Sequence, residues 1–125
     1  MSIVDSSGWI EFLIGSENGE KFRPALQSGD LVVPTVVIVE VRRWLAATQR
    51  AADLVEVTNL MVRGQVISLD AGLAVAAADL GVRYRLPLAD SIVYATAQSR
   101  GLEVWTQDRD FEGLPGVRFV PKTPP

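Results

Sequence analysis

The chain has 125 residues, of which 48% are hydrophobic and 22% are charged, and its formal net charge is -3. This length suits one domain with a buried core, and the apolar share argues against intrinsic disorder. Cysteine and histidine are both absent. Their absence excludes a disulfide framework, a zinc site with Cys or His ligands and a Ser-His-Asp relay. Any acid–base or metal chemistry must therefore depend on Asp, Glu, Lys, Tyr or water.

The N-terminus has no feature of an export signal, because Asp5 follows a short apolar run without a preceding basic region. Glu40, Arg42 and Arg43 interrupt the longest apolar run, which stays well short of the ~20 residues of a membrane span. We therefore expect a soluble cytoplasmic protein with no membrane partner. The acidic balance argues mildly against a nucleic-acid binder. Carboxylates that bind cations would, however, account for much of this charge.

Short apolar runs alternate with helical spacing in the first half of the chain. An initial strand is expected to lead into a helix that Gly15 ends. The β-branched run 36–39 would suit a strand, but Pro34 would interrupt a central ladder and Thr35 is a favoured N-cap, so we expect a helix there. The expected elements are a strand over 2–5, a helix up to 14, a helix over 17–27, a strand over 31–33, and helices over 35–49 and 51–61.

The second half repeats this alternation. Asp70 is expected to cap a helix that stops at Gly81, and Gly101 is expected to end another. The pattern predicts an α/β fold: one domain over 1–121, with a mostly parallel central sheet of four to five short strands flanked by helices, and a flexible tail over 122–125. The expected elements are a strand over 65–67, helices over 70–80 and 89–100, a strand over 102–105, a polar turn over 106–111 and a strand over 117–120.

Acidic side chains lie where such a sheet binds its ligands, beyond the carboxyl ends of the strands. Asp5 ends the first strand and Asp108 follows the strand over 102–105. Glu40 interrupts an otherwise apolar run, and Asp90 follows Pro87 at the start of an apolar helix. A carboxylate in an apolar setting is costly without a partner or a metal. Several of them without His or Cys suit a hard cation such as Mg²⁺ or Mn²⁺.

Each acid also has a purely structural interpretation. Asp5 and Asp90 could cap helices, and Glu40 could pair with Arg43 one turn away. Asp108 and Asp110 could be turn residues. No single acid decides between the two interpretations, but their joint place on one rim of the sheet favours a functional site.

The acidic motifs resemble those of the PIN domain and, within it, of the VapC-type ribonuclease toxins of toxin–antitoxin pairs. The matching segments are residues 4–7, residues 39–41 after Pro34 and Thr35, residues 86–97 and residues 104–117. They occur in order over essentially the whole chain. The third and fourth segments together are more specific than the first alone.

This resemblance implies a Mg²⁺-dependent endoribonuclease in which Mn²⁺ is a possible substitute. Its catalytic acids would be Asp5, Glu40, Asp90 and Asp108. Asp5, Asp90 and Asp108 would bind metal, and Glu40 would act through water. The supporting residues would be Ser7, Thr106 and Asp110, with Asp110 as the alternative to Asp108 for the fourth acid. Hydrolysis of RNA would leave a 5′-phosphate and a 3′-hydroxyl.

The resemblance also implies partners: an RNA substrate, a cognate VapB-type antitoxin and a second copy in a homodimer. Five arginines near the acidic motifs are candidates for phosphate contacts, or for ordinary surface ion pairs: Arg42, Arg43, Arg83, Arg85 and Arg109. Six large apolar side chains could face a partner or belong to the core: Trp9, Phe12, Phe22, Trp44, Leu45 and Leu60.

Two other function classes remain as alternatives. A phospho-accepting receiver module would need an adjacent acidic pair after the first strand and a late lysine. Here Ser6 and Ser7 follow Asp5, and the only late lysine is Lys122, so this alternative is poor. A catalytically silent PIN-like module that binds RNA or protein is the stronger one.

Overall fold

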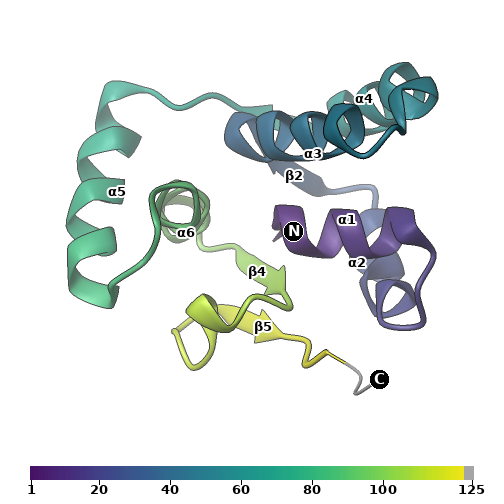
Figure 1. Ribbon diagram of the computed structural model, residues 1–125. Coiled ribbons are helices and arrows are strands. Elements are labelled where there is room, and N and C mark those ends of the chain that lie inside the picture. Colours follow the sequence, from purple (N-terminus) through teal and green to yellow (C-terminus); the bar gives the residue numbers. More distant parts are fainter. Residues whose placement is uncertain (123–125) are drawn as a thin grey trace.

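Five short strands form one sheet in the computed structural model of the protein, which describes residues 1–122 (Figure 1). Their order is β3-β2-β1-β4-β5, and every neighbouring pair is parallel. This confirms the predicted α/β class and parallel sheet. The domain boundary after residue 121 stays a prediction, and residues 123–125 of the expected tail lie outside the described residues. The strands are β1 (Ser2–Val4), β2 (Leu31–Pro34), β3 (Gln65–Ile67), β4 (Glu103–Thr106) and β5 (Val117–Phe119).

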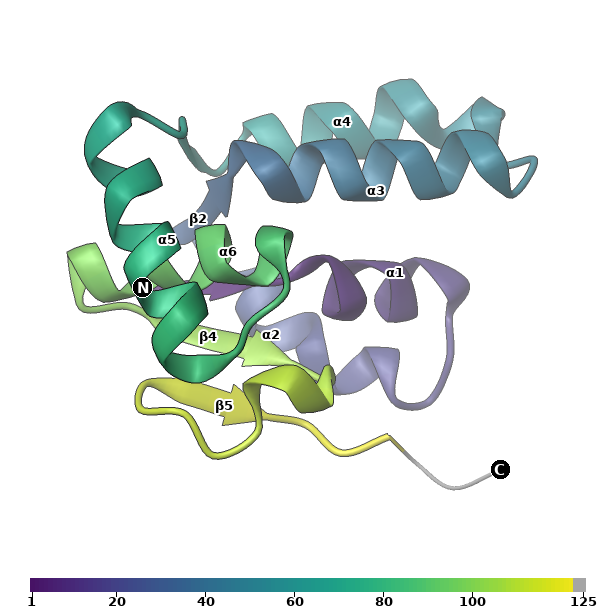
Figure 2. The same cartoon turned by 60° about the vertical axis from the view of Figure 1, so that its left-hand side comes forward.

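The helices gather in pairs around the sheet. In both views α3 and α4 run side by side, and α5 and α6 pack against each other on another side of the molecule (Figures 1 and 2). Within residues 1–122, no helix combines the length and apolar character that a membrane span requires. The α-helices are α1 (Ser6–Ile14), α2 (Arg23–Leu26), α3 (Thr35–Ala47), α4 (Leu54–Val62), α5 (Ala71–Tyr84) and α6 (Leu88–Arg100). The 3₁₀ turns are η1 (Gly19–Phe22), η2 (Ala51–Asp53) and η3 (Arg109–Phe111).

The core lies around the central strands. β1, β2 and β4 carry continuous apolar runs, and such runs are expected where a parallel sheet is buried on both faces. Of the six apolar side chains with two interpretations, most belong to this core. Trp9, Phe22 and Leu45 are fully buried, while Phe12 and Trp44 are half-buried and pack against the core. Leu60 alone among them is exposed.

The helix predicted over 17–27 is wrong, because the structure has the 3₁₀ turn η1 followed by the single turn α2. Pro24 supplies the physical reason. Its nitrogen carries no hydrogen, so it cannot donate the backbone bond that a continuous helix would require at this position. Thr35 is likewise the first residue of α3 and not its N-cap, a position that Pro34 occupies without a side-chain hydrogen bond.

The helix that Asp70 caps does not stop at Gly81. It continues to Tyr84 and ends where Arg85 adopts a left-handed conformation with φ 56°. Gly81 instead lets α5 approach α6, since a Cβ at Gly81 would lie 3.1 Å from the Cβ of Ser91. The glycine therefore serves helix packing, and the position of α6 depends on it.

The order of the strands determines where the acidic residues lie. β1 and β4 are neighbours, with Val4 opposite Trp105, and the backbone N–H of Asp5 donates to the carbonyl of Trp105 at 3.1 Å. The segments that follow β1 and β4 therefore leave the sheet together. Because α6 contacts both strands, its first turn also lies near this edge.

Candidate metal centre

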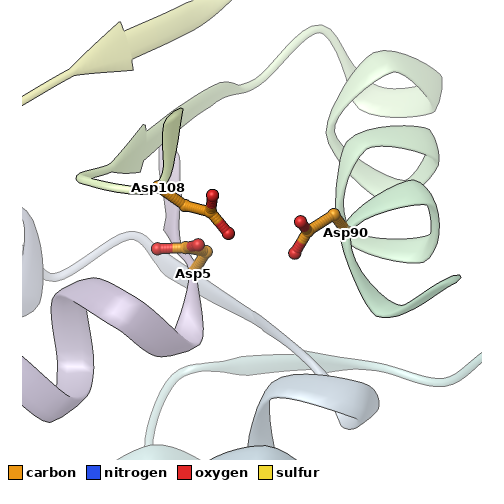
Figure 3. Close-up of side chains that lie close together, drawn as sticks. All are labelled: Asp5, Asp90 and Asp108. Atoms are coloured by element: carbon orange, nitrogen blue, oxygen red, sulfur yellow. The ribbon is translucent and has the colours of Figure 1, made fainter. Parts of the chain in front are cut away.

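Three carboxyl groups converge at the carboxyl edge of the sheet. Asp5 follows β1, Asp108 follows β4 and Asp90 lies in the first turn of α6. One oxygen from each residue lies within 4.8 Å of the others, and Figure 3 shows the three side chains pointing toward one another. We call Asp5, Asp90 and Asp108 the acidic cluster. Three of the four acids expected from the sequence thus share one place.

Asp5 is both a helix cap and the most buried member of the cluster, at 2% exposure. Its backbone is extended, and its Oδ1 accepts hydrogen bonds from the Ser7 hydroxyl at 2.7 Å and the Gly8 N–H at 3.3 Å. Burial raises the pKa of Asp5 to about 6, although hydrogen bonds from Ser7, Thr106 and Gly8 oppose this rise. The carboxylate is therefore held in one orientation in a poorly solvated place.

The backbone at Gly8 permits this tight arrangement. A Cβ at Gly8 would lie 2.7 Å from Cγ1 of Val4 and 2.8 Å from the ring of Phe22. Neither neighbour is free to move, because both are buried in the core. The absence of a side chain at Gly8 thus lets the first turn of α1 sit directly on the strand that carries Asp5.

Thr106 and Asp108 form the β4 side of the cluster. Thr106 is fully buried, and its hydroxyl accepts the backbone N–H of Asp108 at 2.9 Å and lies 3.3 Å from the Ser7 hydroxyl. Asp108 is half-buried and caps η3, with its Oδ1 accepting the Asp110 N–H at 2.9 Å. Ser7 and Thr106 thus link the Asp5 and Asp108 sides of the cluster.

Asp90 is half-buried and has the most perturbed acid–base behaviour of the three. Burial is the largest cause, followed by the charges of Asp108 and Asp5, a side-chain hydrogen bond with Asp108 and the charge of Glu40. Together they raise the pKa of Asp90 to about 8. Asp90 therefore holds a proton at neutral pH when no cation is bound.

Glu40 and Asp110 lie near the cluster but outside it. Glu40 is half-buried on α3, and its charge reaches Asp90, yet its carboxylate is not among the three that converge. Asp110 is exposed in η3 and contributes its backbone N–H to Asp108. The structure thus places Asp108, and not Asp110, beside Asp5 and Asp90.

The candidate arginines neutralise other groups or face solvent. Arg42 donates to the Thr58 hydroxyl at 2.8 Å, and Arg109 pairs with Glu112 at 3.2 Å. Arg83 lies over the Tyr84 ring, 5.1 Å from its centroid. Arg43 and Arg85 are exposed.

Within residues 1–122, no Lys or Arg forms an ion pair with any of the three acids of the cluster. Their negative charge therefore lacks a protein counter-charge. Three carboxylate oxygens in one place are a donor set that suits a hard divalent cation.

Sequence reasoning missed a polar network behind the cluster. The Asn18 amide donates to Gln107 Oε1 at 2.6 Å, and the Gln107 amide donates to Glu11 Oε2 at 3.3 Å. Asn18 and Gln107 are buried, so these bonds fix the segment after β4 against α1 and the loop that follows it. The only signal in the sequence is the place of Gln107 between Thr106 and Asp108.

The chain belongs to the PIN domain family, since the family model for the PIN domain matches residues 2–117. This confirms the resemblance predicted from the acidic motifs. No curated protein sequence matches the chain significantly.

Solved structures with the same fold include components of toxin–antitoxin systems. The chain is similar to one from a toxin–antitoxin complex of Klebsiella pneumoniae, with 22% identity, a TM-score of 0.86 and coverage of 98% of this chain and 100% of that one. It is also similar to VapC20 of Mycobacterium tuberculosis, a toxin that cleaves the sarcin-ricin loop, with 17% identity, a TM-score of 0.79 and coverage of 97% and 100%. A third similar chain comes from a DNA-bound VapBC complex of Salmonella typhimurium, with 20% identity, a TM-score of 0.70 and coverage of 95% and 97%.

Proposed function

We propose that this protein is a Mg²⁺-dependent endoribonuclease and the toxin of a type II toxin–antitoxin pair, acting in the cytoplasm. The observation that carries the proposal is the convergence of Asp5, Asp90 and Asp108 within 4.8 Å. Membership of the PIN domain family supports a nuclease activity for this cluster. The likeness to toxin structures motivates the biological role.

The acidic cluster fits a divalent cation on the chemistry of its own residues. Like charges at short range keep a proton on Asp90, and a bound cation would replace that proton and remove the repulsion. The donors are all carboxylate oxygens, which favours Mg²⁺, with Mn²⁺ as a substitute. Bound there, such an ion would activate a water molecule and stabilise negative charge on the attacked phosphate.

The protein's own residues would position this chemistry. Asp5, Asp90 and Asp108 would hold the cation, and the hydroxyl of Ser7 would keep Asp5 Oδ1 in a single orientation. Thr106 would fix Asp108 through its backbone N–H. Glu40 would bind a water molecule at the rim of the cluster, because its carboxylate lies outside the group of three. Asp110 would support Asp108 through the backbone and not as a ligand.

The products expected from such hydrolysis are a 5′-phosphate and a 3′-hydroxyl. Whether tRNA, ribosomal RNA or messenger RNA is cleaved is a matter for experiment. As the toxin of a pair, the protein would form a homodimer and bind a VapB-type antitoxin whose arm covers the acidic cluster.

The decisive experiment incubates the purified protein with total cellular RNA, with and without Mg²⁺, and maps the new 5′ ends. We expect discrete 5′-phosphate ends that appear only with Mg²⁺ or Mn²⁺. Binding of RNA without any metal-dependent cleavage would instead identify a catalytically silent PIN-like module. Co-expression with the neighbouring small gene then tests the toxin role, since a cognate antitoxin should restore growth and co-purify with the protein.

A further inference from the structure

A second feature opens beside the acidic cluster. It is a pocket of about 440 Å³ lined by Ser7, Gln107, Asp108, Arg109, Phe119 and Lys122. Asp108 belongs to the cluster, and Ser7 donates to Asp5, so the pocket and the cluster share a wall. Whatever fills the pocket therefore lies next to the group that the cluster acts on.

Phe119 differs from every other aromatic side chain in the described part of the chain. All the others lie in the hydrophobic core or pack against it, whereas Phe119 does neither. It is the last residue of β5, opposite Thr106, and is only half-buried. Val117, two residues earlier on the same face of the strand, packs against the core. The ring of Phe119 thus extends past the end of the core and forms a wall of the pocket.

The remaining walls of the pocket are polar or cationic. Arg109 and Lys122 are both exposed, in a protein whose net charge is -3. Arg109 pairs only with the exposed Glu112, and such an exposed pair is weak enough for a phosphate to compete. The Gln107 side chain is held by Asn18 and Glu11, so this wall keeps its shape. An aromatic face beside two cations is the combination that binds single-stranded nucleic acid.

We propose that this pocket binds one unstacked nucleotide adjacent to the scissile phosphate. Its base stacks on Phe119, and its phosphate lies near Arg109 and Lys122. This inference rests on the proposed nuclease function and specifies its substrate: a strand that is unpaired next to the cleaved bond. Every base has a face that can stack. The pocket therefore selects unpaired RNA and leaves the reading of the base sequence to other contacts.

Binding can be measured apart from cleavage in an Asp90→Asn background, which leaves the RNA intact. The probe is a fluorescein-labelled, unstructured oligoribonucleotide, followed by fluorescence anisotropy. Phe119→Ala should weaken binding by roughly 5- to 100-fold, the usual effect of removing one stacking side chain. Phe119→Tyr should keep the parent affinity. Arg109→Ala with Lys122→Ala should weaken binding and reduce the dependence of log affinity on log salt by about two.

Two controls separate stacking from general charge and from misfolding. Arg63→Ala removes an exposed arginine beside the start of β2, at the opposite edge of the sheet, and should leave the affinity unchanged. The fully paired duplex of the same oligoribonucleotide should bind the parent and Phe119→Ala equally. In the cleavage-competent protein, Phe119→Ala should raise KM and leave kcat within about twofold, because the lost contact is made equally in the ground and transition states.

The results distinguish this proposal from the nuclease proposal. Unchanged single-strand affinity in Phe119→Ala, or an equal loss on the duplex, would overturn the nucleotide pocket even if metal-dependent cleavage were found. Conversely, Phe119-dependent binding by a protein that never cleaves RNA would support the pocket and reject the nuclease.

Discussion

The carboxyl groups of Asp90 and Asp108 share a hydrogen bond, although one residue begins α6 and the other follows β4. Such a bond requires a proton between two groups that would both be charged in water at neutral pH. The metal-free protein therefore stores repulsion in the acidic cluster, held by the packing of α6 on β1 and β4. A cation that displaces this proton would turn the repulsion into attraction.

Asp90→Asn should lower RNA cleavage by at least about 100-fold, because it removes a carboxylate oxygen from the cation site. Folding should survive, since the amide has the same shape and carries no charge. The unfolding temperature without metal should equal or exceed that of the parent, as removal of one acid relieves like-charge repulsion. Circular dichroism and a gel-based cleavage assay measure both effects.

The matched control for this variant is Asp53→Asn. Asp53 is an exposed acid in η2, beyond the C-terminal end of α3, and it is not part of the acidic cluster. Cleavage should be unchanged. A clear loss of stability in Asp90→Asn, with Asp53→Asn unaffected, would show that Asp90 has a structural role in place of a catalytic one.

Divalent ions should stabilise the protein in proportion to their occupancy of the cluster. At a Mg²⁺ or Mn²⁺ concentration 100 times the dissociation constant, the free energy of unfolding should increase by about 2.7 kcal/mol. Differential scanning fluorimetry measures this as a rise in Tm, and EDTA should abolish both the rise and the cleavage. The Asp90→Asn variant should respond much less. Cleavage that persists in EDTA would contradict a metal role.

The stability of the metal-free protein should fall as the pH rises from about 5 to about 8. Folding raises the pKa of Asp5 to about 6 and that of Asp90 to about 8, from an ordinary value of 3.8. In this window the folded protein binds more protons than the unfolded chain, so the free energy of unfolding decreases with pH. The lowered pKa values of Glu20 and Asp30 matter only under more acidic conditions.

This dependence can be followed by thermal unfolding at several pH values in EDTA. It should be flatter in Asp90→Asn. Saturating Mg²⁺ should reverse it, since the ion binds the deprotonated carboxylates. A metal-free Tm that climbs steadily between pH 5 and pH 8 would mean that the two acids ionise without penalty in the folded state.

Ser7→Ala should weaken metal binding by roughly 10-fold without abolishing it. The Ser7 hydroxyl is the closest hydrogen-bond donor to Asp5 Oδ1, at 2.7 Å, and groups that orient a ligand typically contribute a factor of this size. Isothermal titration with Mn²⁺ measures the change. An affinity equal to that of the parent would show that burial alone orients Asp5. Ser99→Ala, at the exposed end of α6, is the control.

Gly8→Ala should destabilise the fold by about 1–3 kcal/mol, the usual cost of overpacking a core. The new methyl group would meet Val4 and Phe22, both fully buried. Gly72→Ala is the matched control, because its Cβ would make only an ordinary contact of 3.5 Å in an exposed turn of α5. Urea denaturation of both variants checks the pair, and equal stabilities would show that α1 can shift to admit the methyl group.

Much of this fold could be predicted because local signals agreed with the tertiary structure. Gly15 and Gly101 end their helices in left-handed conformations, and Asp70 caps α5. Gly81 misled because the same residue type serves close packing of α5 on α6, which depends on a helix distant in space and not on its neighbours in sequence.

The candidate site could be predicted in part for a similar reason. Asp5 and Asp108 follow strands, and a parallel sheet brings such positions to one edge. Asp90 required the family resemblance, because nothing local indicates where α6 packs. Glu40 lies outside the cluster, since its place on α3 keeps its carboxylate from the other three. The free face of Phe119 has no signal in the sequence, as only the end of the core determines it.

β4 lies between β1 and β5, although it is among the last elements of the chain to be synthesised. A nascent polypeptide on the ribosome therefore lacks the strand that pairs with β1, and with it Asp108, until nearly the whole message has been translated. A prematurely terminated product would carry Asp5 and Asp90 with no third carboxylate beside them. Translation itself thus delays assembly of the acidic cluster until the protein is almost complete.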